Sequence, residues 1–248
     1  MVPNPIHKVL STLQTHGVQC LLMGGQACVY YGAAEFSRDT DVALLAEPAN
    51  LARLRTALDD LRAVTIAVPS LSLGHLRRGH AVHFRCGHPE AEDMRLDVMS
   101  VLRGLPDFRV LWSRRTTAQF PNGVRYELMS LPDLVIAKKT QRDKDWPMIR
   151  RLVEADYIAG GKSPSAARIV FWLREARTPG LLSDLARRFP NAWEKACAAR
   201  PLLRAVPVSS EEEVARLLRD EEESERARDR VYWTPLRAEL ERLRHRRK

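Results

Sequence analysis

The spacing of hydrophobic and polar positions predicts both helices and strands in the first part of the chain. Apolar residues three and four apart predict a helix over residues 5–16. Val18 to Met23 is a short apolar run that ends at a glycine pair, which is typical of a buried strand. Asp39 to Leu45 reads as a second strand. Leucines on one face predict a helix over 48–61.

The pattern continues with mixed elements as far as about residue 157. Short helices are predicted over 26–31 and 147–157, and Ser130-Leu-Pro-Asp133 has the residue types that begin a helix. The Pro-Asn-Gly at 121–123 is a hairpin signal between two strands. The predicted later strands cover 64–68, 80–86, 94–99, 115–120 and 124–128.

Beyond residue 157 the spacing is almost purely helical. Gly160-Gly161 and Ser163-Pro164 have the composition of a linker. Helices are then predicted over 165–177, 181–189, 191–199, 210–228 and 234–247. Strands mixed with helices followed by helices alone predict an α+β fold, in which a mixed sheet flanked by helices precedes an all-α C-terminal domain. We therefore expect domains at 1–157 and 158–248.

The charge of the chain is positive and unevenly distributed. The formal net charge is +9, and residues 158–248 contribute +6 of it, with 20 basic and 14 acidic side chains. Such a bias suits a polyanion such as RNA, although solvated Arg-rich helices give the same count. The cysteines are scattered, no apolar run is long enough to cross a bilayer, and no secretory signal precedes the first helix. We expect a reduced, cytoplasmic protein with no membrane partner.

Two aspartates stand two residues apart on the second predicted strand. In Asp39-Thr40-Asp41 the carboxylates point to one face, where they repel each other unless a cation lies between them. Mg²⁺ or Mn²⁺ takes such oxygen ligands together with substrate phosphates. Asp97 interrupts another apolar strand and is a candidate third carboxylate. The sequence thus offers Asp39, Asp41 and Asp97 as candidate metal ligands.

The glycine pair precedes these aspartates. Gly24 and Gly25 follow the first predicted strand and open a short helix, where backbone N–H groups can approach a phosphate. A tight strand-to-helix turn is the alternative reading of the same pair. A strand, then Gly-Gly, then Asp-x-Asp on the next strand resembles the nucleotidyltransferase superfamily, whose members are related to DNA polymerase beta.

The resemblance covers about residues 18–157. GGQACVYYGAAEFSRDTDVALL is similar to the first motif of the AbiEii-type and MenT-type toxin nucleotidyltransferases, with Ser37 where threonine is usual and Glu35 where arginine is usual. LPDLVIAKKTQRDKDW is similar to a later helix of the same branch, so that Lys138 and Asp145 match functional positions and Lys139 is a substitute for the lysine.

This resemblance implies Mg²⁺-dependent transfer of a nucleoside monophosphate from an NTP, such as ATP, to an acceptor hydroxyl. It implies catalytic roles for Asp39, Asp41, Asp97, Lys138 and Asp145. Gly24 and Gly25 would hold the triphosphate, and Lys138 or Lys139 would neutralise phosphate charge.

The acceptor stays open. The basic second part favours RNA, such as tRNA-like ends, because RNA is a polyanion. The resemblance adds a toxin-like role with an antitoxin partner. Alternatives are transfer to a small molecule such as an antibiotic, transfer to a protein, and a non-enzymatic relative that binds nucleic acid or a partner.

Histidines and a cysteine gather between residues 75 and 88, which invites a zinc interpretation. Their spacing fits no common structural zinc pattern. His83 and Arg85 would share a strand face beside the carboxylates, where a contact with substrate is a further alternative.

Overall fold

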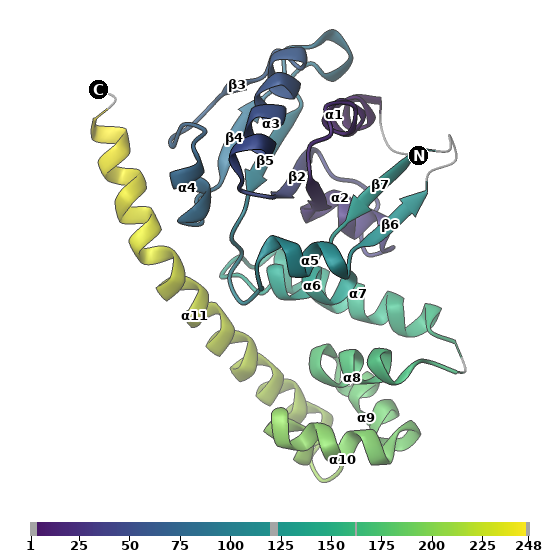
Figure 1. The fold of residues 1–248 in the computed structure, drawn as a ribbon. Helices are drawn as coiled ribbons and strands as arrows, with labels where there is room; N and C mark the ends of the chain where they lie inside the picture. The colour runs from purple at the N-terminus through teal and green to yellow at the C-terminus, as the bar shows by residue number, and fades with distance from the viewer. Residues whose placement is uncertain (1–3, 120–123, 162, 247–248) are drawn as a thin grey trace. The chain divides into compact units, whose positions relative to one another are not determined.

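The computed structural model describes residues 4–119, 124–161 and 163–246 (Figure 1). It is an α+β structure with a mixed sheet, as the sequence predicts. By its contacts the chain divides into two units. The first comprises the chain up to Tyr30, Ala34–Ala137 and the chain from Tyr232 on, and the second comprises Tyr31–Ala33 and Lys138–Val231. The domain boundary between residues 157 and 158 stays a prediction.

The described strands of the first unit form one seven-stranded sheet. Their order is β3-β4-β5-β2-β1-β7-β6, with β1 parallel to β7, β2 parallel to β5, and the other neighbours antiparallel. The central strands therefore include both predicted aspartate strands. The strands are β1 Cys20–Met23, β2 Asp39–Leu44, β3 Val64–Thr65, β4 Val82–Arg85, β5 Arg95–Met99, β6 Thr116–Gln119 and β7 Arg125–Leu128.

Helices of the first unit cover the core face of this sheet. The alternate residues Val42 and Leu44 of β2 and Leu96 and Val98 of β5 are fully buried in a cluster with apolar residues of α1 and α3. Period-two alternation thus turns the other residues of these strands to the opposite face. The helices are α1 Asn4–Thr15, α2 Gly24–Tyr30, α3 Pro48–Asp60, α4 Leu73–Arg77, η1 Pro89–Ala91, α5 Phe108–Ser113 and α6 Leu131–Ala137.

The end of the last helix belongs to the first unit. Glu239 accepts hydrogen bonds from Arg78 Nη2 at 2.8 Å and Arg78 Nε at 3.2 Å. Its Oε2 also lies 2.9 Å from Nε2 of the fully buried His80. The hydrogen bond with His80 and the contacts with Arg78 outweigh burial and lower the pKa of Glu239. These contacts hold the segment after α4 and the end of α11 together.

The described part of the second unit is helical. Trp172, Leu182 and Leu185 are fully buried in it. Arg200 donates to the carbonyls of Leu173 at 2.9 Å and Ala176 at 2.8 Å, which satisfies the end of α8. The helices are α7 Asp145–Ala159, α8 Ala166–Glu175, α9 Pro179–Arg188, α10 Pro190–Ala199, η2 Pro201–Arg204 and α11 Glu211–His245. None of the helices that the structure describes has the length and apolar character needed to span a bilayer.

Several predicted elements need correction. The two helices predicted over 210–228 and 234–247 are one helix, α11, with Pro235 inside it. The strand predicted over 64–68 is shorter: β3 pairs with β4 at Val64 and Thr65, and the Ile66 N–H then donates to the His83 carbonyl at 2.9 Å. Helices α4 and α5 were not expected. Strands β6 and β7 pair antiparallel as predicted, whereas the hairpin signal at 121–123 lies outside the described residues.

Candidate functional site

Polar side chains lie in a row across three neighbouring strands. In the sheet register Asp41 of β2 stands opposite Asp97 of β5, and Asp97 stands opposite His83 of β4. Asp39, two residues before Asp41, stands opposite Arg95. Directly opposed residues of neighbouring strands share a face, and the strands are about 4.8 Å apart. The sheet therefore brings the three predicted carboxylates together on the face away from the α1 and α3 core.

Asp97 is the most constrained of the three carboxylates. Its Oδ1 accepts a hydrogen bond from Arg95 Nε at 2.8 Å and lies 2.8 Å from His83 Nδ1. Its side chain is 14% exposed. Burial alone would raise the pKa of Asp97, but the hydrogen bonds and charges of His83 and Arg95 outweigh it and lower the pKa. Asp97 is thus an anion at neutral pH.

Whether His83 Nδ1 carries a proton determines which of two neighbours it can bond. Nδ1 lies 2.8 Å from Asp97 Oδ1 and 3.1 Å from Arg95 Nη2. A protonated Nδ1 donates to Asp97, whereas an unprotonated Nδ1 would accept from Arg95 and place its lone pair against the carboxylate. We favour the first arrangement because it avoids that repulsion.

Arg95 supplies positive charge to the carboxylates. The hydrogen bond with Asp97 raises the pKa of Arg95, burial opposes this, and the negative charges of Asp97, Asp39 and Asp41 raise it further. Its side chain is 40% exposed, so each of these attractions is partly screened by solvent. Arg95 was not among the residues predicted from the sequence. The alternation Arg95-Leu96-Asp97, which puts the charged pair on one strand face, is the signal that could have found it.

The glycine pair is explained by what lies against it. Gly24 has φ +66°, and an ideal Cβ there would stand 1.9 Å from Asp41 Oδ2 and 2.5 Å from Asp41 Cγ. A Cβ on Gly25 would stand 2.3 Å from Ser37 Oγ and 2.8 Å from Ser37 Cβ. Side chains with a Cβ essentially never approach so closely. Packing therefore favours glycine at both positions without any ligand, and a phosphate contact at either stays a prediction.

The segment before β2 is held to α2 by hydrogen bonds. The buried Gln26 donates from Nε2 to the carbonyl of Ser37 at 2.7 Å. Ser37 Oγ donates to the carbonyl of Asp39 at 3.3 Å. These bonds, with the close contact at Gly25, fix where β2 begins and hence where Asp39 and Asp41 stand beside the turn.

The carboxylates have the donor chemistry of a site for a hard divalent cation. Mg²⁺ and Mn²⁺ prefer carboxylate oxygens, and three carboxylates share one face here. Over residues 4–119, 124–161 and 163–246, no three Asp, Glu, His or Cys side chains already converge closely enough to hold a metal ion. A cation bound by Asp39, Asp41 and Asp97 together would therefore require these side chains to move closer; Arg95 and His83 both contact Asp97 through Oδ1.

The remaining predicted residues belong to the second unit and have partners there. Lys138 Nζ lies 3.5 Å from Oδ1 of the buried Asp145. Asp145 Oδ2 also accepts from Thr140 Oγ1 at 2.5 Å and from Arg142 Nε at 2.7 Å. Lys139 Nζ lies 2.7 Å from a carboxylate oxygen of Glu175. The structure thus pairs Lys138 with Asp145, and each lysine charge has a carboxylate partner.

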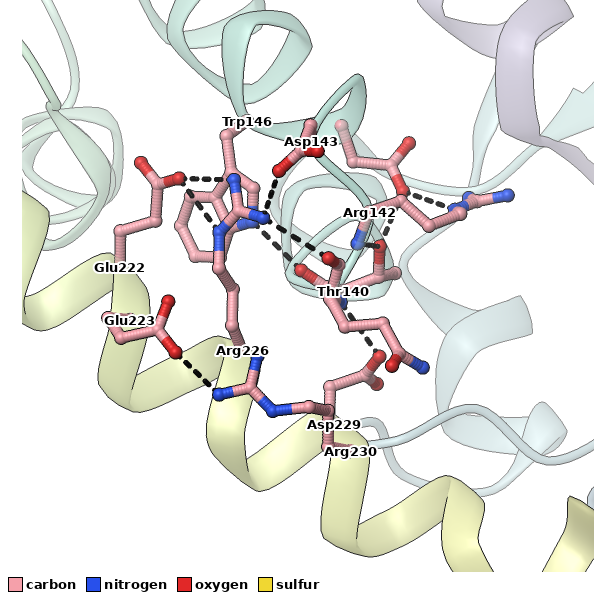
Figure 2. Close-up of polar contacts among 11 residues, drawn as sticks. Thr140, Arg142, Asp143, Trp146, Glu222, Glu223, Arg226, Asp229 and Arg230 are labelled. Atoms are coloured by element: carbon pink, nitrogen blue, oxygen red, sulfur yellow. Dashed lines mark hydrogen bonds and ion pairs between the residues drawn. The ribbon is translucent and has the colours of Figure 1, made fainter.

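Helix α11 anchors the segment between Lys138 and Trp146 within this unit (Figure 2). Arg226 donates to Asp143 Oδ1 at 2.6 Å, to the Gln141 carbonyl at 3.1 Å and to Glu222 Oε1 at 2.6 Å. Its guanidinium lies over the Trp146 ring, 5.6 Å from the centroid. The buried Asp229 accepts from the Gln141 N–H at 2.9 Å. These contacts give the segment a structural role that its spacing alone does not reveal.

The histidines considered for zinc have separate surroundings. His75 and His80 make an edge-to-face contact with ring centroids 6.0 Å apart, and His83 contacts Asp97. His88 accepts from the Glu90 N–H at the start of η1. Each thus has a role within the fold, and among the described residues no three such ligands form a metal group.

Comparison with known protein families and with curated proteins gives no match for this chain. Function is therefore inferred from Asp39, Asp41 and Asp97, here called the carboxylate row, and from the glycine turn beside them.

Proposed function

We propose that the chain is a nucleotidyltransferase that requires Mg²⁺ or Mn²⁺ and transfers a nucleoside monophosphate from an NTP to an acceptor hydroxyl. The register that sets Asp41 opposite Asp97, with Asp39 on the same face, carries the proposal. Three carboxylates on one face of two neighbouring strands repel one another, and a bound divalent cation would offset this repulsion beyond what Arg95 supplies. Their position beside the Gly24 turn supports the sequence resemblance independently of composition.

Asp39, Asp41 and Asp97 would hold the metal ion. When bound, it would neutralise phosphate charge and bring the acceptor oxygen toward the α-phosphorus. In the overall reaction, the bond from the acceptor oxygen to the α-phosphorus forms, the bond from the α-phosphorus to the oxygen bridging to the β-phosphate breaks, pyrophosphate leaves, and the proton of the acceptor hydroxyl is released to solvent. The residues of the chain contribute mainly position and charge, because phosphoryl chemistry needs little covalent participation by protein.

The lowered pKa of Asp97 separates two possible roles for it. A carboxylate held as an anion by Arg95 and His83 is a good metal ligand and a weak proton acceptor. Asp97 is therefore assigned to metal binding and to orienting the acceptor hydroxyl. The phosphate role of Lys138 or Lys139 and the catalytic role of Asp145 stay predictions, because their known partners are in their own unit.

RNA is the proposed acceptor class, supported by the positive charge of residues 158–248. Many arginines of this stretch already form ion pairs, which leaves fewer of them available for contacts with RNA phosphates than their number suggests. Examples are Arg168, Arg177, Arg187, Arg200, Arg216, Arg226, Arg228 and Arg230. A toxin-like role and an antitoxin partner rest on the resemblance alone.

The test incubates the full chain with each labelled NTP, Mg²⁺ and total cellular RNA, beside the Asp39→Ala/Asp41→Ala double variant. Label in an RNA band that the double variant does not produce supports RNA as acceptor and identifies the nucleotide. Label only on protein or on an added aminoglycoside would replace RNA with that acceptor. No Mg²⁺-dependent NTP binding by the unaltered chain would overturn the proposal.

A further inference from the structure

The second unit contains a cavity of about 730 Å³ between its helices. We call it the helical pocket; residues of α8, α10 and α11 line it, with Lys139, Arg177 and Arg200 from the connecting segments. Cavities of about 300–1,000 Å³ are the size of small-molecule sites. The apolar part of the lining comes from α8 and α10 and consists of Ala166, Ile169, Val170, Ala192, Ala196 and Ala199.

Two buried arginines in the lining share one carboxylate. Glu221 Oε2 accepts from Arg200 Nη2 at 2.8 Å and from Arg177 Nη1 at 2.5 Å. Arg200 has further partners, because it also donates to Glu221 Oε1 and to two backbone carbonyls. Arg177 has fewer, since its next carboxylate contact, with Glu175 Oε2, is 3.8 Å long.

Arg177 carries a donor that the fold does not use. Its side chain is 6% exposed, and its Nε–H is buried with no hydrogen-bond partner among the described residues. A buried donor without a partner destabilises the fold unless a ligand or water accepts from it. Burial and then the neighbouring positive charge of Arg200 lower the pKa of Arg177, and the nearby glutamates only partly oppose this. Arg177 thus keeps one N–H without a hydrogen-bond partner among the described residues, although its charge is paired with Glu221.

The lining of the helical pocket has a net positive charge, like Arg177. Among the described residues that line the pocket, five are basic and three are acidic, which leaves a surplus of two positive charges. Lys139 is balanced by Glu175 at 2.7 Å. Arg174 and Lys195, two of the five basic residues already counted, are exposed. A ligand with an anionic group and an apolar body complements both the charge and the apolar part of the lining.

We propose that the helical pocket binds a small organic phosphate, with its phosphate near Arg174, Arg177 and Lys195 and its body against the alanine, isoleucine and valine residues of the lining. Guanidinium groups are suited to this ligand because they donate two parallel hydrogen bonds to phosphate oxygens. The lining residues of the helical pocket belong to the second unit, and the carboxylate row belongs to the first. Lys139 of the lining also has a predicted transferase role, but the proposed phosphate position does not use it.

Calorimetric titration of the full chain in EDTA tests this inference without a contribution from a metal-dependent site. The probes are adenosine 5′-monophosphate, decyl phosphate, adenosine and inorganic phosphate. At least one of the first two should bind, at least about tenfold more tightly than adenosine or inorganic phosphate. Tighter binding of decyl phosphate would identify an aliphatic body, and tighter binding of the nucleotide would identify a nucleoside body.

Matched variants locate the binding. Val170→Glu places a carboxylate on the apolar part of the lining, and Arg174→Glu reverses a charge of the lining; each should weaken binding at least about tenfold. Val208→Glu and Arg219→Glu make the same changes at exposed positions of the second unit away from the pocket and should leave binding unchanged. Absence of binding by both phosphate probes, or equal binding by all four variants, would overturn the inference.

Discussion

Gly24 lies directly against the carboxylate of Asp41. An ideal Cβ on Gly24 would stand 1.9 Å from Asp41 Oδ2, and the backbone there has φ +66°. The first glycine of the pair and the second aspartate of the Asp-Thr-Asp stretch are therefore one packing unit across β1 and β2. Their separation in sequence reflects the length of α2 and the segment that returns the chain to the sheet.

Gly24→Ala should destabilise the chain through both backbone strain and this clash. Gly32→Ala is the matched control, because Gly32 has φ +74° but no described atom within 4 Å of an added Cβ. Strain at positive φ costs about 1–2 kcal/mol in either variant. Gly24→Ala should cost about 1–3 kcal/mol more, as overpacking does. Urea unfolding measures both, and equal losses would show that Asp41 yields freely.

Gly25→Ala should be rescued by a change at its neighbour. The added Cβ would meet Ser37 Oγ at 2.3 Å and Ser37 Cβ at 2.8 Å, but Ser37 Cα only at 3.9 Å. We expect Gly25→Ala to cost about 1–3 kcal/mol, and Ser37→Gly to recover part of that loss in the double variant. A double-mutant cycle by thermal unfolding gives the coupling. Additive losses would contradict the contact.

Arg95→Met should lower the stability of the metal-free chain and enlarge the rise in Tm that a divalent cation causes. Arg95 is the cation that the structure sets among the carboxylates, and its loss leaves them to repel one another. Because the side chain is partly exposed, we expect a loss of about 1 kcal/mol in EDTA. Millimolar Mg²⁺ should then raise Tm more in Arg95→Met than in the unaltered chain.

Arg55→Met, at an exposed position of α3, is the control for that experiment. It should respond to Mg²⁺ as the unaltered chain does. A smaller Mg²⁺ response in Arg95→Met than in Arg55→Met would mean that Arg95 supports the cation and does not compete with it.

The pH dependence of stability should include a contribution from Asp97. Its pKa is lowered in the folded chain from an ordinary value near 3.8, so the unfolded chain binds its proton first as pH falls. The stabilisation is therefore complete above the unfolded pKa and is lost as pH falls through the folded pKa. Asp97→Asn should reduce the difference in unfolding free energy between pH 6 and about pH 3. An unchanged difference would contradict the ion pairs with Arg95 and His83.

Arg226→Met should release the segment that α11 anchors in the second unit. Arg226 donates to Asp143, Gln141 and Glu222, so its loss should cost about 1–3 kcal/mol. Hydrogen exchange should rise at the backbone of residues 140–146. Arg219→Met changes an exposed arginine of the same helix and should leave that exchange unchanged. Equal exchange in both variants would contradict the anchoring role.

The strands that hold the candidate site were predictable from sequence, whereas its charge balance was not. Alternation within Asp39–Leu44 places Asp39 and Asp41 on one face of their strand, and alternation within Arg95–Met99 sets Asp97 apart from its apolar neighbours. The register that puts Asp41 opposite Asp97 depends on tertiary pairing, which cannot be read from one sequence. For the same reason the contacts of Arg95 and His83 with Asp97 could not be predicted.

The misjudged elements have physical causes. The sequence predicts a break at residues 229–233, but α11 continues through them and through Pro235 over 35 residues. Pairs such as Arg216–Asp220 and Arg226–Glu222, one turn apart, support the continuous helix. Helices α4 and α5 have only 5 and 6 residues, too short for a periodic pattern to identify.

Titration of Mn²⁺ binding, followed by electron paramagnetic resonance, tests the central claim most directly. The unaltered chain with NTP should bind Mn²⁺, and Asp41→Asn should lower the affinity at least about tenfold, because a carboxylate ligand is lost. Asp59→Asn removes one negative charge at an exposed position of α3 and should bind as the unaltered chain does. Equal Mn²⁺ affinity in the Asp41 and Asp59 variants would contradict a metal site at the carboxylate row.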